Sequence, residues 1–257
     1  MLFRSNYPEK FDTYFEPFLG GGAVMFNLLS KHPNLKCHVS DLNSNLILAY
    51  VAIRDKVTEL IDSLENHAKK YQNNHSEYYY QIRESEPTSQ IEQVSKLIFL
   101  NKTCFNGLYR VNSKGKFNVP LGKYTNPNIV NRENLLTVSR ILQSSNIEFF
   151  CRDFEAILHD TKKGDFVYLD PPYQPVSKTA NFTSYTTRNF TDDDLERLAT
   201  IAEKLHYKGC KILISNSKSK KVQNSFSSSV WKMREIHVNR AINSNSKKRT
   251  GHSEILI

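Results

Sequence analysis

An aspartate, two prolines and a tyrosine stand directly after a hydrophobic run. The run is DFVYLD at 165–170, and Pro171, Pro172 and Tyr173 follow it. Each proline disfavours the helical conformation of the preceding residue, so we expect a stiff, extended strand end. The Asp170 carboxylate and the Pro171 carbonyl could accept hydrogen bonds from an aromatic amine, and the Tyr173 ring could stack on its base. Such acceptors favour lone-pair density on a nitrogen that receives a methyl group. Asp170, Pro171, Pro172 and Tyr173 are therefore the predicted catalytic residues.

Three consecutive glycines, Gly20–Gly22, follow the strand-like segment TYFEPFL at 13–19. Glycine lets a backbone turn sharply into a helix and approach a ligand closely. Asp41 ends the next strand-like segment, about 20 residues later, where a carboxylate can accept both hydroxyls of a ribose. The chain has neither the G-x-G-x-x-G spacing of dinucleotide-binding folds nor a P-loop. The pattern favours a nucleoside ligand without phosphates, and the alternative is a tight turn that binds nothing.

The elements that must position these residues form an α/β pattern at both ends of the chain. Strand-like segments are expected at 13–19, 36–43, 147–151, 165–170 and 210–215, and an antiparallel pair at 234–239 and 253–257. Helices are expected at 23–31 and 192–205, the second with Thr191 as its N-cap. The middle of the chain is more helical, with helices at 46–80, 91–104 and 131–142 and a loop at 106–128. We predict an α/β fold with an open, mostly parallel, seven-stranded Rossmann-like sheet. Its discontinuous catalytic domain, residues 1–51 and 146–257, is interrupted by a mainly helical domain, residues 52–145.

The net charge of +9 over 257 residues is unevenly distributed. Residues 93–132 sum to +7, residues 204–257 to +10 and the remainder to −8. Two basic zones on an acidic body favour a polyanion held at two places, although solvated charge is an equal alternative.

No apolar run is long enough to span a membrane, and the first residues lack a signal peptide's apolar core. The four cysteines are scattered, and the histidines lack ligand spacing, so we expect buried thiols, no metal site and a cytoplasmic location.

The glycine turn, the insertion and the later DPPY, in this order, resemble the adenine-N6 DNA methyltransferases that use S-adenosylmethionine. Three longer stretches extend the resemblance to nearly the whole chain: FNGLYRVNSKGKFNVPLGKY (105–124), TANFTSYTTRNFT (179–191) and ISNS (214–217). They are similar to the Dam family, including the Dam-like methylases of GATC restriction systems. The resemblance implies direct methyl transfer, without a covalent intermediate, to N6 of an adenine flipped out of duplex GATC. It also makes residues 52–145 a target-recognition domain.

The resemblance further implies which residues border the methyl donor: Phe18, Gly20, Gly22, Asp41, Asp153, Phe154 and Asp170. Asp153 and Phe154 would flank the adenine of the donor. From the residues alone, core packing is the stronger reading of Phe154. The donor is a sulfonium cation, which suits the acidic remainder of the chain.

The block at 105–124 resembles the family's target-recognition hairpin. By position, Phe105 would fill the gap left by the flipped base. The residues that would face the GATC bases are Asn106, Leu108, Arg110 and Pro120. Arg110 suits a bidentate contact with guanine, worth about 1–3 kcal/mol of discrimination. Basic residues nearby (Lys102, Lys114, Lys116 and Lys123) and in a later turn (Lys247, Lys248 and Arg249) would contact phosphates, or are merely solvated. Residues 180–185 resemble the loop beside the flipped base.

The family's N-terminal K-W-x-G-G-K motif has no counterpart in this sequence. In the family, its aromatic residue and second lysine contact the donor, and its first lysine contacts DNA. A truncated start, a diverged site or an inactive remnant would each account for this, and the intact later motifs favour a truncated start. The competing hypothesis is a catalytically impaired, sequence-reading DNA-binding protein. An RNA or cytosine-N4 methyltransferase is a third reading, although cytosine enzymes more often carry Ser-Pro-Pro-Tyr.

Double-stranded DNA is the expected partner, and a monomer associated with the nucleoid fits transfer at a single site. The protein would either protect DNA against a restriction endonuclease that cuts the same site, without a stable complex, or act alone in repair or regulation.

Overall fold

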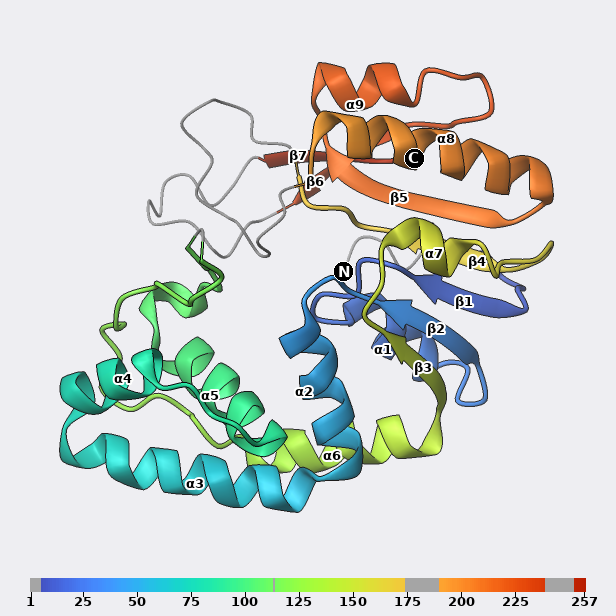
Figure 1. The fold of residues 1–257 in the computed structure, drawn as a ribbon. Coiled ribbons are helices and arrows are strands. Elements are labelled where there is room, and N and C mark those ends of the chain that lie inside the picture. Colours follow the sequence, from blue (N-terminus) through green and yellow to red (C-terminus); the bar gives the residue numbers. More distant parts are fainter. Residues whose placement is uncertain (1–5, 113, 174–189, 239–251) are drawn as a thin grey trace. The chain divides into compact units, whose positions relative to one another are not determined.

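The computed structural model describes residues 6–112, 114–173, 190–238 and 252–257. These residues form two compact units (Figure 1). The sheet unit contains the described residues up to Leu42 and those from Asn146 onward, and the helical unit contains those from Asn43 to Ser145. The helical unit therefore begins earlier than the boundary at residue 52 that was expected from the sequence. The reason is packing, because the helix at Ser44–Asp55 lies against three other helices of the helical unit.

The sheet unit is built on seven strands in the order β3-β2-β1-β4-β5-β7-β6. Their bounds are β1 Thr13–Glu16, β2 Lys36–Ser40, β3 Asn146–Phe150, β4 Phe166–Leu169, β5 Lys211–Ser217, β6 Arg234–Val238 and β7 His252–Leu256. Strands β3, β2, β1, β4 and β5 are parallel, and β7 runs antiparallel to both β5 and β6. This confirms the expected α/β class, the mostly parallel sheet and the closing antiparallel pair.

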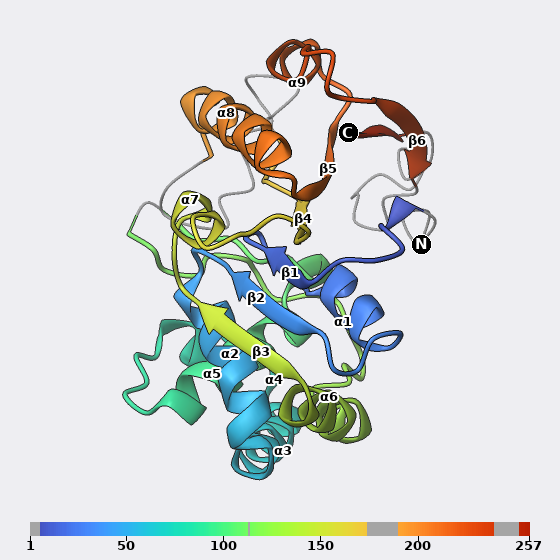
Figure 2. The same ribbon diagram turned by 90° about the vertical axis from the view of Figure 1, so that its right-hand side faces the viewer.

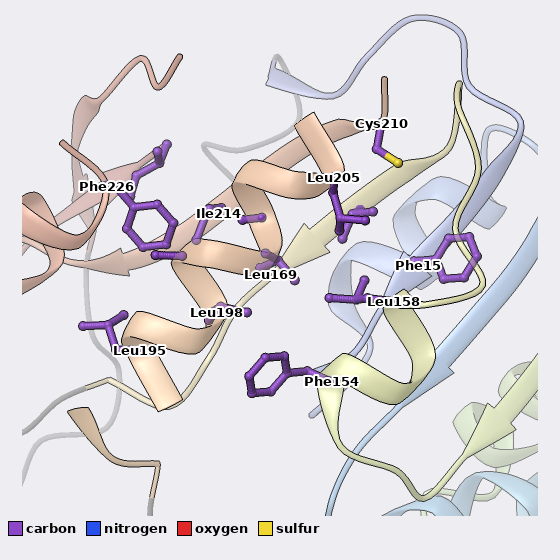
Figure 3. Close-up of a cluster of buried hydrophobic side chains, with 14 of the residues drawn as sticks. Phe15, Phe154, Leu158, Leu169, Leu195, Leu198, Leu205, Cys210, Ile214 and Phe226 are labelled. Atoms are coloured by element: carbon purple, nitrogen blue, oxygen red, sulfur yellow. The ribbon is translucent and has the colours of Figure 1, made fainter. Parts of the chain in front are cut away.

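Side chains alternate between the two faces of this sheet, as extended strands require. Phe15, Val167 and Leu169 face a buried apolar cluster that they share with helices α7 (Phe154–Leu158) and α8 (Asp192–Lys208) (Figure 3). Helix α1 (Ala23–Leu29) covers the other face (Figure 2). A short helix, α9 (Lys220–Ser225), packs beside α8. Neither α7 nor α9 was expected from the sequence, because helices this short show no recognisable apolar period.

Local capping signals set the start of α8. Thr191 accepts a hydrogen bond from the Asp194 backbone N–H, and the Asp194 carboxylate accepts from the Thr191 backbone N–H. This reciprocal pair satisfies two backbone donors that a helix start otherwise leaves unpaired. The helix continues to Lys208 and stops at Gly209, whose φ of 92° is left-handed. The predicted N-cap is therefore confirmed, and the helix is slightly longer than the sequence indicated.

The helical unit contains five α-helices in its described residues. They are α2 Ser44–Asp55, α3 Val57–Asn73, α4 His75–Glu84, α5 Gln90–Thr103 and α6 Arg132–Ser144. The region expected to be helical over 46–80 is divided at Lys56 and at Asn74, whose side chain caps α4. A separate apolar cluster, which includes Leu60, Leu64 and Phe99, holds the five helices together. Among the helices that the structure describes, none combines the length and apolar character needed to cross a membrane.

Candidate active site

The carboxyl ends of four adjacent parallel strands bring the predicted residues of the sheet unit to one edge. Gly20 follows β1, Asp41 follows β2, Asp153 follows β3 and Asp170 follows β4. Ligands of open α/β sheets bind outside this edge, because the strand ends and their loops form a crevice there. Residues that are far apart in the sequence thus share one edge through the strand order alone.

The glycine turn between β1 and α1 has the backbone geometry of a close-approach site. Gly20 and Gly22 have φ values of 47° and 64°, which are left-handed and strained for other residues. The Gly20 N–H donates to Asp41 Oδ2 over 3.0 Å, which ties the turn to the end of β2. A methyl group added at Gly20 or Gly21 would meet no atom within 4 Å. Open space therefore lies over this part of the turn, where a ligand could approach the backbone.

Asp170 lies one residue beyond β4, beside Ser215 of β5, because Leu169 pairs with Ile214. The residue reaches solvent, yet protein surrounds its carboxyl closely enough that desolvation raises its pKa to about 7. The negative charge of Glu254 raises this pKa further, whereas hydrogen bonding with Tyr168 and Ser215 opposes the rise. A raised carboxyl pKa in a crevice is typical of a functional site.

The remaining residues of the DPPY motif continue the extended chain past β4. Pro171 is buried and Pro172 is exposed. Tyr173 is partly buried, and its hydroxyl lies 3.2 Å from the Ser215 hydroxyl. This contact holds the tyrosine at the same strand edge as Asp170, and the raised pKa of Tyr173 keeps its hydroxyl neutral.

Glu16, at the end of β1, is a buried carboxyl that was not among the residues predicted from the sequence. Its residue is only 2% exposed, and burial raises its pKa to about 8. The nearby charge of Asp170 also raises this pKa, whereas the Tyr14 hydroxyl and the Met25 backbone N–H lower it. Within the described chain, Glu16 Oε2 has no hydrogen-bond partner. Glu16 is therefore held mostly protonated at neutral pH, next to the aspartate of the DPPY motif.

Asp153 and Phe154 form the first turn after β3. Asp153 is the N-cap of α7 and accepts a hydrogen bond from the Glu155 N–H over 3.1 Å. Phe154 is only 3% exposed, and its ring centroid lies 5.5 Å from that of Phe18. Phe154 therefore packs in the buried apolar cluster, as the alternative reading of its sequence position expected. Contact of either residue with a donor stays a prediction.

Within the helical unit, the start of the 105–124 segment presents a large aromatic ring to solvent. Phe105 begins a short 3-10 helix, Phe105–Gly107, and is 39% exposed. Asn106 has a φ of 55°, so a non-glycine residue occupies a strained, left-handed conformation. The Phe105 N–H donates to the Pro120 carbonyl, and the Asn101 side chain donates to the Gly107 carbonyl. These bonds stabilise an exposed position for Phe105 that apolar burial alone would not favour.

Arg110 is held by the opposite arm of the same hairpin. The Asn118 N–H donates to the Arg110 carbonyl over 3.1 Å. The guanidinium returns two bonds, from Nε to Asn118 Oδ1 over 2.7 Å and from Nη2 to the Asn118 carbonyl over 3.3 Å. Leu108 is half-buried and Pro120 is exposed. The structure thus brings Phe105, Asn106, Leu108, Arg110 and Pro120 onto one hairpin.

A sequence profile described as D12 class N6 adenine-specific DNA methyltransferase matches residues 2–243 of this chain. The chain belongs to this family. It is 44% identical over 213 residues to the type II methyltransferase M.MjaIII of Methanocaldococcus jannaschii, which covers 79% of this chain and 73% of that protein. It is 38% identical over 254 residues to the type II methyltransferase M1.LlaDCHI of Lactococcus lactis subsp. cremoris, covering 96% and 85%. It is 32% identical over 250 residues to the DNA adenine methylase of Escherichia coli K12, covering 96% and 86%. The protein is an adenine-specific DNA methyltransferase.

Several residues of this methyltransferase surround the predicted site without having been singled out from the sequence. Glu16, Tyr168, Ser215 and Glu254 lie around Asp170, and Arg197 lies beside Asp153. One signal was available for Glu16, because a charged residue inside an apolar strand, between Phe15 and Pro17, is unusual. The other residues carry no local signal, since their importance depends on which strands and helices become neighbours.

Two predicted parts of this methyltransferase lie outside the residues that the structure describes. They are the basic residues Lys247, Lys248 and Arg249, and the segment 180–185 that resembles the loop beside the flipped base. Their proposed contacts with DNA stay predictions.

Proposed function

We propose that this methyltransferase transfers a methyl group from S-adenosylmethionine to N6 of a flipped-out adenine in duplex GATC. The observation that supports this most strongly is the placement of Asp170, beyond β4, at the same sheet edge as the glycine turn and Asp41. An acceptor for an aromatic amine and a candidate nucleoside site thus lie at one edge of the sheet.

The residues at the glycine turn fit a nucleoside that carries a positive charge. Open space at Gly20 and Gly21 would admit the ligand, and Gly22 is the N-cap of α1. Asp41 would accept the ribose hydroxyls, and Asp153 would accept the adenine amine. S-adenosylmethionine supplies the methyl group as a sulfonium, and the carboxylates at this edge complement that charge.

The DPPY residues would act on the target amine. The nitrogen lone pair of an exocyclic amine is delocalised into its ring, so the nitrogen is a weak nucleophile. If Asp170 and the Pro171 carbonyl each accept one N–H, positive charge that develops on the nitrogen is stabilised where it forms. Tyr173 would stack on the base, and no covalent bond to the protein is needed.

The hairpin of the helical unit would read the DNA. A target adenine inside a duplex cannot reach an active site, so it must leave the stack, and the exposed Phe105 ring would fill the gap. Arg110 would contact a guanine with its outer edge, because Asn118 already engages its Nε and part of Nη2. Exposed lysines of the hairpin would contact phosphates, which orient the protein without specifying sequence.

The recognition sequence can be checked by transfer of labelled methyl groups to matched duplexes. We expect incorporation into a GATC duplex, at N6 of adenine after digestion to nucleosides, and little incorporation when the four bases are scrambled. Binding of GATC without incorporation would support the DNA-binding remnant instead. Label in cytosine, or preferential labelling of RNA, would support the third reading.

Arg110→Ala is expected to lower discrimination at one guanine of the site. A lost bidentate contact corresponds to about 1–3 kcal/mol, or about 5- to 150-fold in the preference for guanine at that position. Lys114→Ala, on an exposed lysine of the same hairpin, should weaken binding similarly for all sequences and reduce its salt dependence. The measurement is kcat/KM for GATC and for each duplex with one base pair replaced. Equal losses on every duplex for the Arg110 variant would contradict a base-reading role.

The names of the relatives divide between type II methyltransferases and DNA adenine methylases. Protection against a nuclease that cuts the same site, and independent action by a monomer, therefore both remain compatible with the proposed reaction.

A further inference from the structure

Arg197, on the second turn of α8, contacts three carboxylates and one aromatic ring of the sheet unit. Its Nη1 and Nη2 lie 3.0 Å from Asp153 Oδ1 and Oδ2, respectively. Nη2 also lies 3.0 Å from Asp194 Oδ1, and Nη1 lies 3.1 Å from Glu155 Oε2. The guanidinium carbon stands 4.3 Å from the centroid of the Phe154 ring. One side chain thus connects the start of α8 to both residues of the turn after β3.

The paired contact with Asp153 fixes the plane of that carboxylate. A guanidinium presents two parallel N–H groups that match both oxygens, whereas an ammonium offers only a point charge. Arg197 and Asp153 have side chains that are 34% and 30% exposed. Ion pairs with this much solvent contribute little to stability, about 0–1 kcal/mol. Orientation of Asp153 and Phe154 is therefore a better explanation of this arrangement than stability.

Among the residues that the structure describes, the contacts of Asp153 leave room for one more donor. Oδ1 accepts from Arg197 and from the Glu155 N–H, whereas Oδ2 accepts from Arg197. A carboxylate oxygen can accept about two hydrogen bonds. Oδ2 therefore retains capacity for an amine N–H, in a direction that Arg197 sets.

Phe154 is held from several sides at the same place. Arg197 lies over its ring, and the rings of Phe18 and Phe190 lie at centroid distances of 5.5 Å and 6.3 Å. Figure 3 shows Phe154 at the start of α7, within the cluster that α8 covers with Leu195 and Leu198. Phe190 directly precedes the N-cap of α8, so Arg197 and Phe190 hold the same helix end against the turn after β3.

We propose that Arg197 is a positioning residue for the adenine end of the methyl donor. It orients Asp153 to accept the adenine amine and fixes the Phe154 ring next to it. The inference rests on the proposed assignment of Asp153 to the donor adenine, and it adds a residue that has no contact with the donor in this scheme.

The test compares two ligands that differ only at the purine amine. They are S-adenosylhomocysteine and its 6-deamino analogue, in which a hydrogen atom replaces the amine, and their Kd values are measured by calorimetry without DNA. We expect the parent protein to prefer the adenosine compound by about tenfold or more, because the analogue loses a hydrogen bond to a charged acceptor. Arg197→Ala should lower this preference at least about fivefold, since an unclamped Asp153 can rotate away.

Three further variants make the result interpretable. Asp153→Ser keeps a good N-cap for α7 but removes the carboxylate, so the preference should disappear. Arg197→Lys keeps the charge but not the paired geometry, so it should also lose most of the preference. It takes the place of Arg197→Ala in the test if that variant does not fold. Arg152→Ala removes a neighbouring arginine whose guanidinium stacks on Phe150 instead, and the preference should stay unchanged. Thermal unfolding of each variant checks the fold.

An unchanged preference in a folded Arg197→Ala or Arg197→Lys variant, together with its loss in Asp153→Ser, would overturn the role of Arg197 and leave the proposed adenine site intact. An unchanged preference in Asp153→Ser would overturn both the adenine assignment and the inference built on it.

Discussion

Asp170→Asn is expected to lower the rate of methyl transfer by at least about 10²- to 10³-fold while duplex binding persists. The variant keeps the size of the side chain but removes the negative charge that would stabilise the developing positive charge on the target nitrogen. Single-turnover rates on GATC duplex measure the chemical step directly. Asp170→Ala should lose at least as much, because it also removes the acceptor.

The pH dependence of Asp170 gives the same prediction an independent signature. Protonation of this carboxyl removes its negative charge, and its pKa in the free protein is about 7. The kcat/KM of the parent protein should therefore fall as pH drops below about 7, since this parameter reports the free enzyme. Asp170→Asn should lack that acidic limb. Asp62→Asn, at an exposed aspartate of α3, is the matched control and should behave like the parent. Full transfer activity in Asp170→Asn would rule out the proposed role.

Glu16→Gln is expected to stabilise the protein at alkaline pH and to change little at pH 5. The folded protein holds the Glu16 proton with a pKa of about 8, compared with an ordinary value of 4.5. The pKa of Glu16 is higher in the folded protein than in the unfolded chain. Binding of the proton therefore contributes fully to the stability of the fold below pH 4.5, and this contribution is lost as pH rises to about 8. The difference corresponds to at most about 5 kcal/mol. Glutamine has a similar shape and does not ionise, so the variant escapes this loss.

The measurement is the free energy of unfolding in urea for both proteins between pH 5 and pH 9. The advantage of Glu16→Gln should grow between pH 5 and about pH 8 and level off above that. Glu9→Gln changes an exposed glutamate near the N-terminus, so its curve should stay parallel to that of the parent. Parallel curves for Glu16→Gln would show that Glu16 is ionised in the folded protein, contrary to its burial.

Much of the fold follows from signals that act between neighbours in the sequence. Thr191 caps α8 because the partner of its hydroxyl is three residues away. Pro171 and Pro172 restrict the residues before them by local steric contact, so the extended end of β4 could be anticipated. The long apolar periods of α5 and α6 indicated helices for the same reason. Helices α7 and α9 were missed because five and six residues are too few to show a period.

The sequence was less informative about where one unit ends and the next begins. Helix α2 follows β2 closely and has no composition that separates it from the sheet unit. Its buried residues pack against α5 and α6, which places it with the helical unit. A boundary of this kind depends on packing partners, which local patterns do not specify.

By itself, the sequence determined the order of the motifs, the sharp glycine turn and the acidic residues that end the strands, because chain geometry near each motif depends on adjacent residues. Only the tertiary structure decided that the pKa values of Glu16 and Asp170 are raised, since desolvation depends on the strands that surround them. Likewise, Arg197 lies 44 residues from Asp153 in the sequence, and the meeting of α8 with the turn after β3 pairs them. The chemistry of each motif was therefore encoded locally, whereas the charge state and orientation of its carboxylates came from segments that folding brings together.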